Sequence, residues 1–127
     1  MTGKIPAKTL ESLLDALPVE ISFVDAKETV QYFNRDGARI FPRNKSVIGM
    51  KVQNCHSPKS LEKVQAILDG FKKGTLNKVE FWTDLQGKKI LISYFPVRDK
   101  KGKFLGTLEV TQDITEIQKL KGEKRLL

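Results

Sequence analysis

The chain has 127 residues, of which 39% are hydrophobic, and a formal net charge of +8. This length supports one domain with a single core and excludes a two-domain protein. The single cysteine, Cys55, excludes an intramolecular disulfide and favours a reducing compartment. No apolar run approaches membrane-spanning length, and residues 1–6 lack the apolar core of a signal peptide, so we expect a soluble, cytoplasmic protein without membrane contact.

The first part of the chain predicts a helix followed by a hairpin. Four leucines have the spacing of one apolar stripe on an amphipathic helix: Leu10, Leu13, Leu14 and Leu17. Pro18 ends this helix. Strands are predicted over 19–24 and 30–34, because both runs are rich in β-branched and aromatic residues and are separated by turn residues.

The middle of the chain predicts helical segments. A short helical turn is expected over 36–41, halted by Pro42, and a second short piece over 47–52. A longer helix is predicted from Pro58 to Lys73. Ser57 is a suitable cap for it, proline is favoured at a first helical position, and a glycine follows its end.

The last part predicts three strands and an exit helix. The strands span 79–83, 90–97 and 104–110, joined by turns over 84–87 and 98–102. A helix is expected to begin at Asp113, whose carboxylate can accept from the free N–H groups of a first turn, with Glu116 three residues later. The segments are then a flanking helix (1–18), a core (19–112) and an exit helix or linker (113–127).

Together these elements predict an α+β fold with a five-stranded antiparallel sheet and helices packed on one face. Three motifs in this order resemble those of the PAS sensor family. They are Phe23-Val24-Asp25 with Val30 and Asn34, then Val47-Ile48-Gly49, then Asp113-Ile114-Thr115. The resemblance covers about Leu13 to Leu120 and implies a sensory or interaction module. Such a module binds a small ligand in its core or mediates dimerisation, and transmits a change through the C-terminal helix.

Two further stretches resemble a narrower group within this family. They are Asn54-Cys55-His56-Ser57-Pro58-Lys59-Ser60 and the C-terminal Gly122-Glu123-Lys124-Arg125-Leu126-Leu127. Both are similar to the PAS domain that ends uncharacterised prokaryotic proteins with a hemerythrin-like domain upstream. The resemblance implies either a C-terminal piece of such a protein or a stand-alone relative. His56 is the only histidine, so the sequence contains no hemerythrin-type set of histidines.

Aromatic residues lie mainly on the predicted strands, and one alternating half of them must face the helices. That face is the natural wall of a small-molecule pocket, with an apolar lining and a few polar anchors. The candidate pocket residues are Phe23, Tyr32, Cys55, His56, Phe81, Ser93, Tyr94 and Thr107. A filled core without a cavity is the alternative.

The residues around Cys55 bear on two cofactors of the PAS family, flavin and haem. Asn54-Cys55 resembles the dipeptide of flavin-binding light sensors, but the residues after the cysteine differ, and the strand over 90–97 has no Asn to bind a flavin edge. We therefore do not expect flavin. Haem-binding PAS sensors use a histidine from the helical side of the pocket, where His56 lies. We expect His56 to bond a loop carbonyl instead, and a haem-based gas or redox sensor with His56 as axial ligand stays the alternative function.

Catalysis and nucleic-acid binding are not favoured. Cys55 and His56 are adjacent, so they cannot face each other as nucleophile and base across a cleft, and no phosphate-binding glycine loop is present. Most of the clustered lysines lie beside glycines at turns, without interleaved aromatic residues. A basic nucleic-acid-binding domain is retained only as a third alternative, and no metal site is expected unless His56 binds haem.

Two features concern assembly and signalling. The leucine stripe lies outside the predicted core, so we expect it to mediate a homodimer. Asp113 and Thr115 are the predicted coupling residues, because they stand where the last strand meets the exit helix. The family pattern implies that Asp113 is tied to the sheet, with Arg35 as a candidate partner.

Overall fold

The computed structural model describes residues 2–127, so the first residue of the flanking segment predicted over 1–18 lies outside it. In the described chain, two α-helices and five strands follow in this order: α1 (Ala7–Asp15), β1 (Glu20–Asp25), β2 (Val30–Phe33), α2 (Pro58–Lys73), β3 (Val79–Leu85), β4 (Lys88–Arg98) and β5 (Phe104–Asp113). Short 3-10 helices are η1 (Lys45–Val47), η2 (Val52–Cys55) and η3 (Ile117–Lys119). All five predicted strands and the two longer predicted helices are confirmed, with shifts at several ends.

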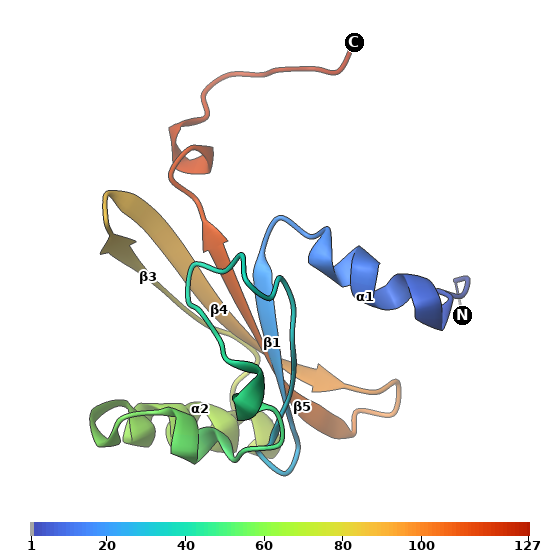
Figure 1. The fold of residues 1–127 in the computed structure, drawn as a ribbon, viewed down its shortest axis with the longest axis vertical. Helices are drawn as coiled ribbons and strands as arrows, with labels where there is room; N and C mark the ends of the chain where they lie inside the picture. Colours follow the sequence, from blue (N-terminus) through green and yellow to red (C-terminus); the bar gives the residue numbers. More distant parts are fainter. Residues whose placement is uncertain (1) are drawn as a thin grey trace.

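The strands form one antiparallel sheet in the order β2-β1-β5-β4-β3. Val24 lies opposite Thr107, and Tyr94 lies opposite Glu109. Because side chains alternate between the faces of a sheet, these four share one face. Helix α2 and the segment after β2 cover that face (Figure 1). The predicted α+β fold is therefore confirmed.

Helix α2 has the predicted limits. Pro58 occupies the first turn, and Gly74 ends the helix with a left-handed φ of 78°. Leu68 and Phe71 are buried on its inner side. Ser57 does not cap the helix through its side chain, because its hydroxyl lies 3.3 Å from the hydroxyl of Ser60 instead.

The helical turn predicted over 36–41 is wrong. This segment consists of turns and bends. The backbone N–H groups of Ile40 and Phe41 donate to the side chain of Glu20, 2.5 and 3.0 Å away, rather than to a preceding turn. A distant carboxylate thus replaces the partners that a helix would provide.

The exit helix predicted from Asp113 is also absent from residues 113–127. β5 continues to Asp113, which pairs with Ile90, and the N–H of Ile114 donates to Lys89 of β4 at 2.9 Å. A single turn follows, in which the N–H of Gln118 donates to the carbonyl of Ile114 at 2.9 Å, but the bonds of this turn are not continued beyond η3. The chain makes only the short η3 and then leads away from the sheet (Figure 1).

The apolar stripe of α1 is largely uncovered. Leu10 and Leu13 are 43% and 42% exposed. The end of the helix is nevertheless fastened to the fold, because the side chain of Asn34 donates to the carbonyl of Leu14 at 2.8 Å. None of the helices described is long and apolar enough to cross a membrane.

Gly106 allows β5 to approach β1 closely. A Cβ here would lie 2.3 Å from the carbonyl oxygen of Val24, and φ is +156°. We predict that Gly106→Ala lowers the free energy of unfolding by about 3 kcal/mol, measured by urea denaturation. Gly102→Ala is the control, because φ is +85° but no atom lies within 4 Å. It should cost about 1 kcal/mol, and an equal loss in the two variants would contradict the role of the close approach.

Candidate ligand-binding site

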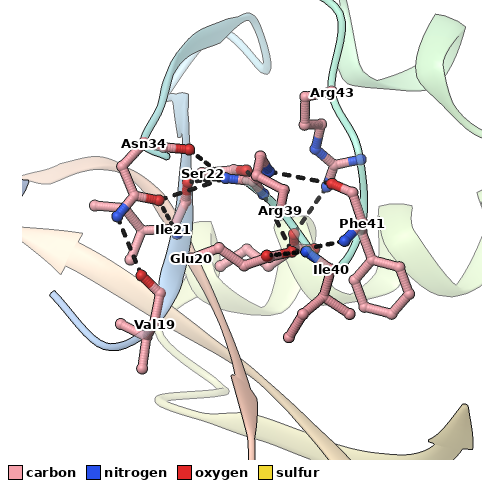
Figure 2. Close-up of polar contacts among 10 residues, drawn as sticks. Val19, Glu20, Ile21, Ser22, Asn34, Arg39, Ile40, Phe41 and Arg43 are labelled. Atoms are coloured by element: carbon pink, nitrogen blue, oxygen red, sulfur yellow. Dashed lines mark hydrogen bonds and ion pairs between the residues drawn. The ribbon is translucent and has the colours of Figure 1, made fainter. Parts of the chain in front are cut away.

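A buried ion pair fastens the segment after β2 to β1. The side chains of Arg39 and Glu20 are 2% and 3% exposed, and their Nη2 and Oε1 atoms are 3.7 Å apart. Figure 2 shows the Glu20 carboxylate between Arg39 and the backbone of Ile40 and Phe41. A buried carboxylate without partners is strongly unfavourable, so these contacts fix the path of the segment.

Asn34 extends this arrangement to α1. Its buried side chain accepts from the N–H of Ile21 at 2.6 Å and donates to the carbonyls of Leu14 and Val19 at 2.8 and 3.1 Å. Arg39 donates to the backbone carbonyls of Ile21 and Asn34 at 3.1 and 2.9 Å. Glu20, Asn34 and Arg39, called the Glu20 cluster below, therefore join α1, β1 and the segment after β2.

A cavity of about 300 Å³ lies between the sheet and the elements that cover it. Its apolar lining comes from the sheet, the covering segment and α2, and includes Val24, Val30, Val47, Val52, Ile67 and Leu68. Its ionisable and hydroxyl-bearing lining side chains are Ser22, Arg43, Cys55, His56, Tyr94, Thr107 and Glu109. The volume lies at the lower end of the range for small-molecule sites.

Four polar lining residues lie together and are called the polar end of the cavity below: Arg43, Tyr94, Thr107 and Glu109. Two of them form an ion pair. Nη2 of Arg43 is 2.9 Å from Oε1 of Glu109, and the two side chains are 31% and 17% exposed. Arg43 comes two residues after Phe41, whose N–H is held by the Glu20 cluster, and Figure 2 shows these neighbours together. Burial, followed by the charge of Glu109, raises the pKa of Tyr94 well above its ordinary value, so its hydroxyl stays protonated at neutral pH.

Thr107 brings an unsatisfied hydroxyl to the cavity wall. The residue is 5% exposed, and its Oγ1 has no hydrogen-bond partner among the residues described. Most buried polar side-chain atoms in proteins are paired. Rotation about the Cα–Cβ bond of Thr107 would present this hydroxyl to a bound molecule.

His56 and Cys55, which lie at the end of η2, also line the cavity. Nδ1 of His56 is 2.9 Å from the carbonyl oxygen of Val52, which confirms the expected bond to a loop carbonyl. Donation from Nδ1 leaves Nε2 free as an acceptor. Cys55 is exposed and its thiol donates weakly to the carbonyl of Lys51, 3.7 Å away.

The cavity does not fit a haem. Nε2 of His56 is the one imidazole nitrogen available to iron, but the cavity volume of about 300 Å³ is near the minimum for small-molecule ligands. A porphyrin would need the covering segment and α2 to move outward. In residues 2–127, no cluster of three or more His, Cys, Asp or Glu side chains could hold a metal ion.

The structure brings half of the candidate pocket residues together. Cys55, His56, Tyr94 and Thr107 line the cavity. Phe23 and Tyr32 pair with each other on the opposite face of the sheet, so their assignment to the pocket is wrong.

Ser93 and Phe81 also lie outside the cavity. Ser93 precedes Tyr94 and therefore points to the other face, where its hydroxyl donates to Glu80 at 2.9 Å. Phe81 is on the correct face but at the sheet edge, and its ring stacks on Tyr94 with centroids 6.1 Å apart.

Two further site residues, Arg43 and Glu109, are not among the residues predicted from the sequence. The signal for Glu109 was present, because Thr107, Glu109 and Thr111 alternate along β5 with the apolar Leu108 and Val110. Three polar residues at alternating positions of a central strand indicate a polar wall rather than a filled apolar core.

A second polar cluster joins the β1–β2 turn to α2. The carboxylate of Glu28 accepts from Gln65 at 2.8 Å and from Gln53 at 2.9 Å, and it pairs with Lys72 at 3.1 Å. Burial alone would raise the pKa of Glu28, but these contacts outweigh it and hold the pKa below its usual value. This Glu28 cluster holds α2 against the hairpin.

The predicted coupling residues are tied to β4. Oδ1 of Asp113 accepts from the N–H and the hydroxyl of Thr115 at 3.0 and 2.6 Å, and that hydroxyl accepts from the N–H of Lys89 at 2.9 Å. The bonds from Thr115 lower the pKa of Asp113. The expected pairing with Arg35 is wrong, because Arg35 bonds Asp15 and the carbonyl of Leu17 instead.

The family model for the PAS domain matches residues 10–115. The chain belongs to the PAS domain family. A C-terminal domain from Streptococcus mutans is 33% identical, with 95% of this chain and 94% of that chain covered and a TM-score of 0.89. That relative is described as a C-terminal domain, and the hemerythrin-like domain upstream of the present chain stays a prediction.

More distant structures share the fold of this PAS domain. The PAS domain of Bordetella pertussis BvgS is 18% identical, with 85% of each chain covered and a TM-score of 0.62. A sensory box sensor histidine kinase from Vibrio cholerae is 14% identical, with 85% of this chain and 90% of that chain covered and a TM-score of 0.58. A search of curated proteins found no match.

Removing Arg39 should leave the buried carboxylate of Glu20 without its counter-charge. We predict that Arg39→Met lowers the free energy of unfolding by about 3 to 5 kcal/mol, measured by urea denaturation. The double variant Glu20→Gln/Arg39→Met carries no buried charge and should regain part of this loss. Wild-type stability in Arg39→Met, or a double variant less stable than the single one, would contradict the role of the ion pair.

Proposed function

We propose that this PAS domain is a non-enzymatic sensory module that binds a small organic molecule in the cavity. One observation carries the proposal: a cavity with a largely apolar lining has a polar end, where the buried hydroxyl of Thr107 has no partner in the described chain. A bound molecule would supply that partner. Membership of the PAS family and the description of the Vibrio cholerae relative as a sensor histidine kinase support a role in signalling.

The signal passes along β5. Thr107 and Glu109 line the cavity on this strand, and the same strand ends at Asp113. A molecule that alters the contacts of Glu109 would act on β5 directly. The bonds that Thr115 donates to Asp113, and the bond that Lys89 donates to Thr115, set the direction in which the chain leaves the sheet.

The domain also acts as a homodimer in this proposal. The exposed leucines of α1 form an apolar stripe that the rest of the described chain does not cover. Burying this stripe against a second copy would remove it from water.

A variant that fills the cavity tests ligand binding. In a fragment screen followed by NMR, we expect hits that shift the amide signals of Thr107 and Glu109 in the wild-type domain. Val64→Trp places a large ring in the cavity and should abolish these shifts, whereas Val110→Trp on the opposite face of β5 should retain them. The proposal is wrong if no fragment shifts these signals, or if the two variants respond alike.

Hydrogen exchange tests the coupling role of Asp113. Asp113→Ala should accelerate exchange of the amides of Thr115 and Lys89 and loosen residues 114–120, because their anchoring bonds are lost, while Ile92 stays protected. The control is Asp99→Ala, which removes a similar turn in which Asp99 accepts from Lys101 and Lys103. Unchanged exchange at Thr115 and Lys89 in Asp113→Ala would show that Asp113 has no coupling role.

Light scattering tests the homodimer. We expect a dimer mass for the wild-type domain at high micromolar concentration and a monomer mass for Leu13→Lys, which places a charge in the stripe. Leu105→Lys is the matched control, since Leu105 is 40% exposed but lies on β5. A monomer mass for the wild-type domain, or a dimer that survives Leu13→Lys, would contradict this arrangement.

A further inference from the structure

The charges that line the cavity cancel each other. Of the lining residues in the described chain, Arg43 is the one lysine or arginine and Glu109 the one aspartate or glutamate. Their side chains meet at 2.9 Å, and both are more than two-thirds buried. The polar end of the cavity is therefore a satisfied ion pair and not an excess of either charge.

A charged ligand would disturb this pair. An anion at this end would share the single positive charge of Arg43 with Glu109, and a cation would share the single negative charge of Glu109 with Arg43. Either event leaves one largely buried charge without a counter-charge, which is strongly unfavourable. A neutral molecule can enter with the pair intact.

The same groups still have hydrogen-bonding capacity. Arg43 uses one of its five N–H donors on Glu109. Thr107 carries a hydroxyl that can donate or accept and that has no partner among the described residues, whereas the hydroxyl of Tyr94 interacts with Glu109. A ligand group with an acceptor beside a donor can bond both kinds of atom.

We propose that the cavity selects an uncharged small molecule with an apolar body and an amide-like end, an inference that rests on the proposed function. Its carbonyl would accept from the free N–H groups of Arg43, and its N–H would donate to Thr107. The apolar body would lie against side chains such as Val24, Ile67 and Leu68. The Arg43–Glu109 pair therefore acts as a filter against ions of either sign.

Three probes of one shape and different charge test this selection. Benzamide is neutral, benzoate is an anion and benzamidine is a cation at neutral pH. Benzene fills an apolar cavity of about 150 Å³, so a substituted ring fits here. Titration of the wild-type domain, followed by NMR at Thr107 and Glu109, should show benzamide binding at least tenfold more tightly than the charged probes.

Two variants separate the contribution of the ion pair to charge selection from the contribution of the Thr107 hydroxyl to affinity. Glu109→Gln leaves Arg43 without its carboxylate, so benzoate should gain at least tenfold relative to benzamide. Thr107→Val keeps the volume and removes the unpartnered hydroxyl, so benzamide should bind about fivefold more weakly, as expected for one lost hydrogen bond. The stability of ligand-free Thr107→Val should equal or exceed that of the wild type, which excludes unfolding as the cause.

Each result bears on one idea. If benzoate or benzamidine binds the wild-type domain as tightly as benzamide, selection for a neutral ligand is wrong and ligand binding in the cavity stands. If none of the three probes shifts the signals, the inference is overturned, and the fragment screen with Val64→Trp decides the proposed function separately. Unchanged benzamide affinity in Thr107→Val would remove Thr107 from the site.

Discussion

The buried pair of Glu20 and Arg39 is the constraint on which the candidate site depends. The stretch over 35–44 has no helix or strand to hold it in place. Its position comes from polar contacts with β1, including the two backbone N–H groups that Glu20 accepts. Arg43 lies in the same stretch, two residues after Phe41. The Glu20–Arg39 pair outside the cavity therefore helps to position the Arg43–Glu109 pair that lines it. A hydrophobic contact is not directional and could not set an arginine with the same precision.

Local patterns were sufficient to predict most of the fold. The strands alternate with period 2, and Pro58 and Gly74 mark the limits of α2. Both failures concern segments that carry local helix signals. In the segment 36–41 the N–H groups of Ile40 and Phe41 bond to Glu20, which is distant in sequence, and the chain after Asp113 forms one turn that ends at η3. Tertiary hydrogen bonds can override local helix propensity, and a local sequence pattern does not reveal them.

The site was harder to predict than the fold. Aromatic and hydroxyl residues on strands were selected by type, whereas membership of the cavity depends on which face each residue takes. Ser93 and Tyr94 are neighbours, and only Tyr94 faces inward. Arg43 and Glu109 are 66 positions apart, and their contact depends on the path of an irregular segment. The sequence contains both residues but no sign that they meet.

The two walls of the cavity differ in how they are held. The sheet wall consists of five strands with continuous ladders of backbone bonds. The covering wall is held by side-chain contacts of the Glu20 and Glu28 clusters, by the Arg43–Glu109 pair and by backbone bonds of residues 49–52 with the β1–β2 hairpin. Because it has no continuous ladder of backbone bonds, this wall can open locally while the ladders of the sheet stay intact. Entry and release of a guest molecule can then proceed on a fully folded sheet, and residence time becomes a property of the contacts of the covering wall rather than of global stability.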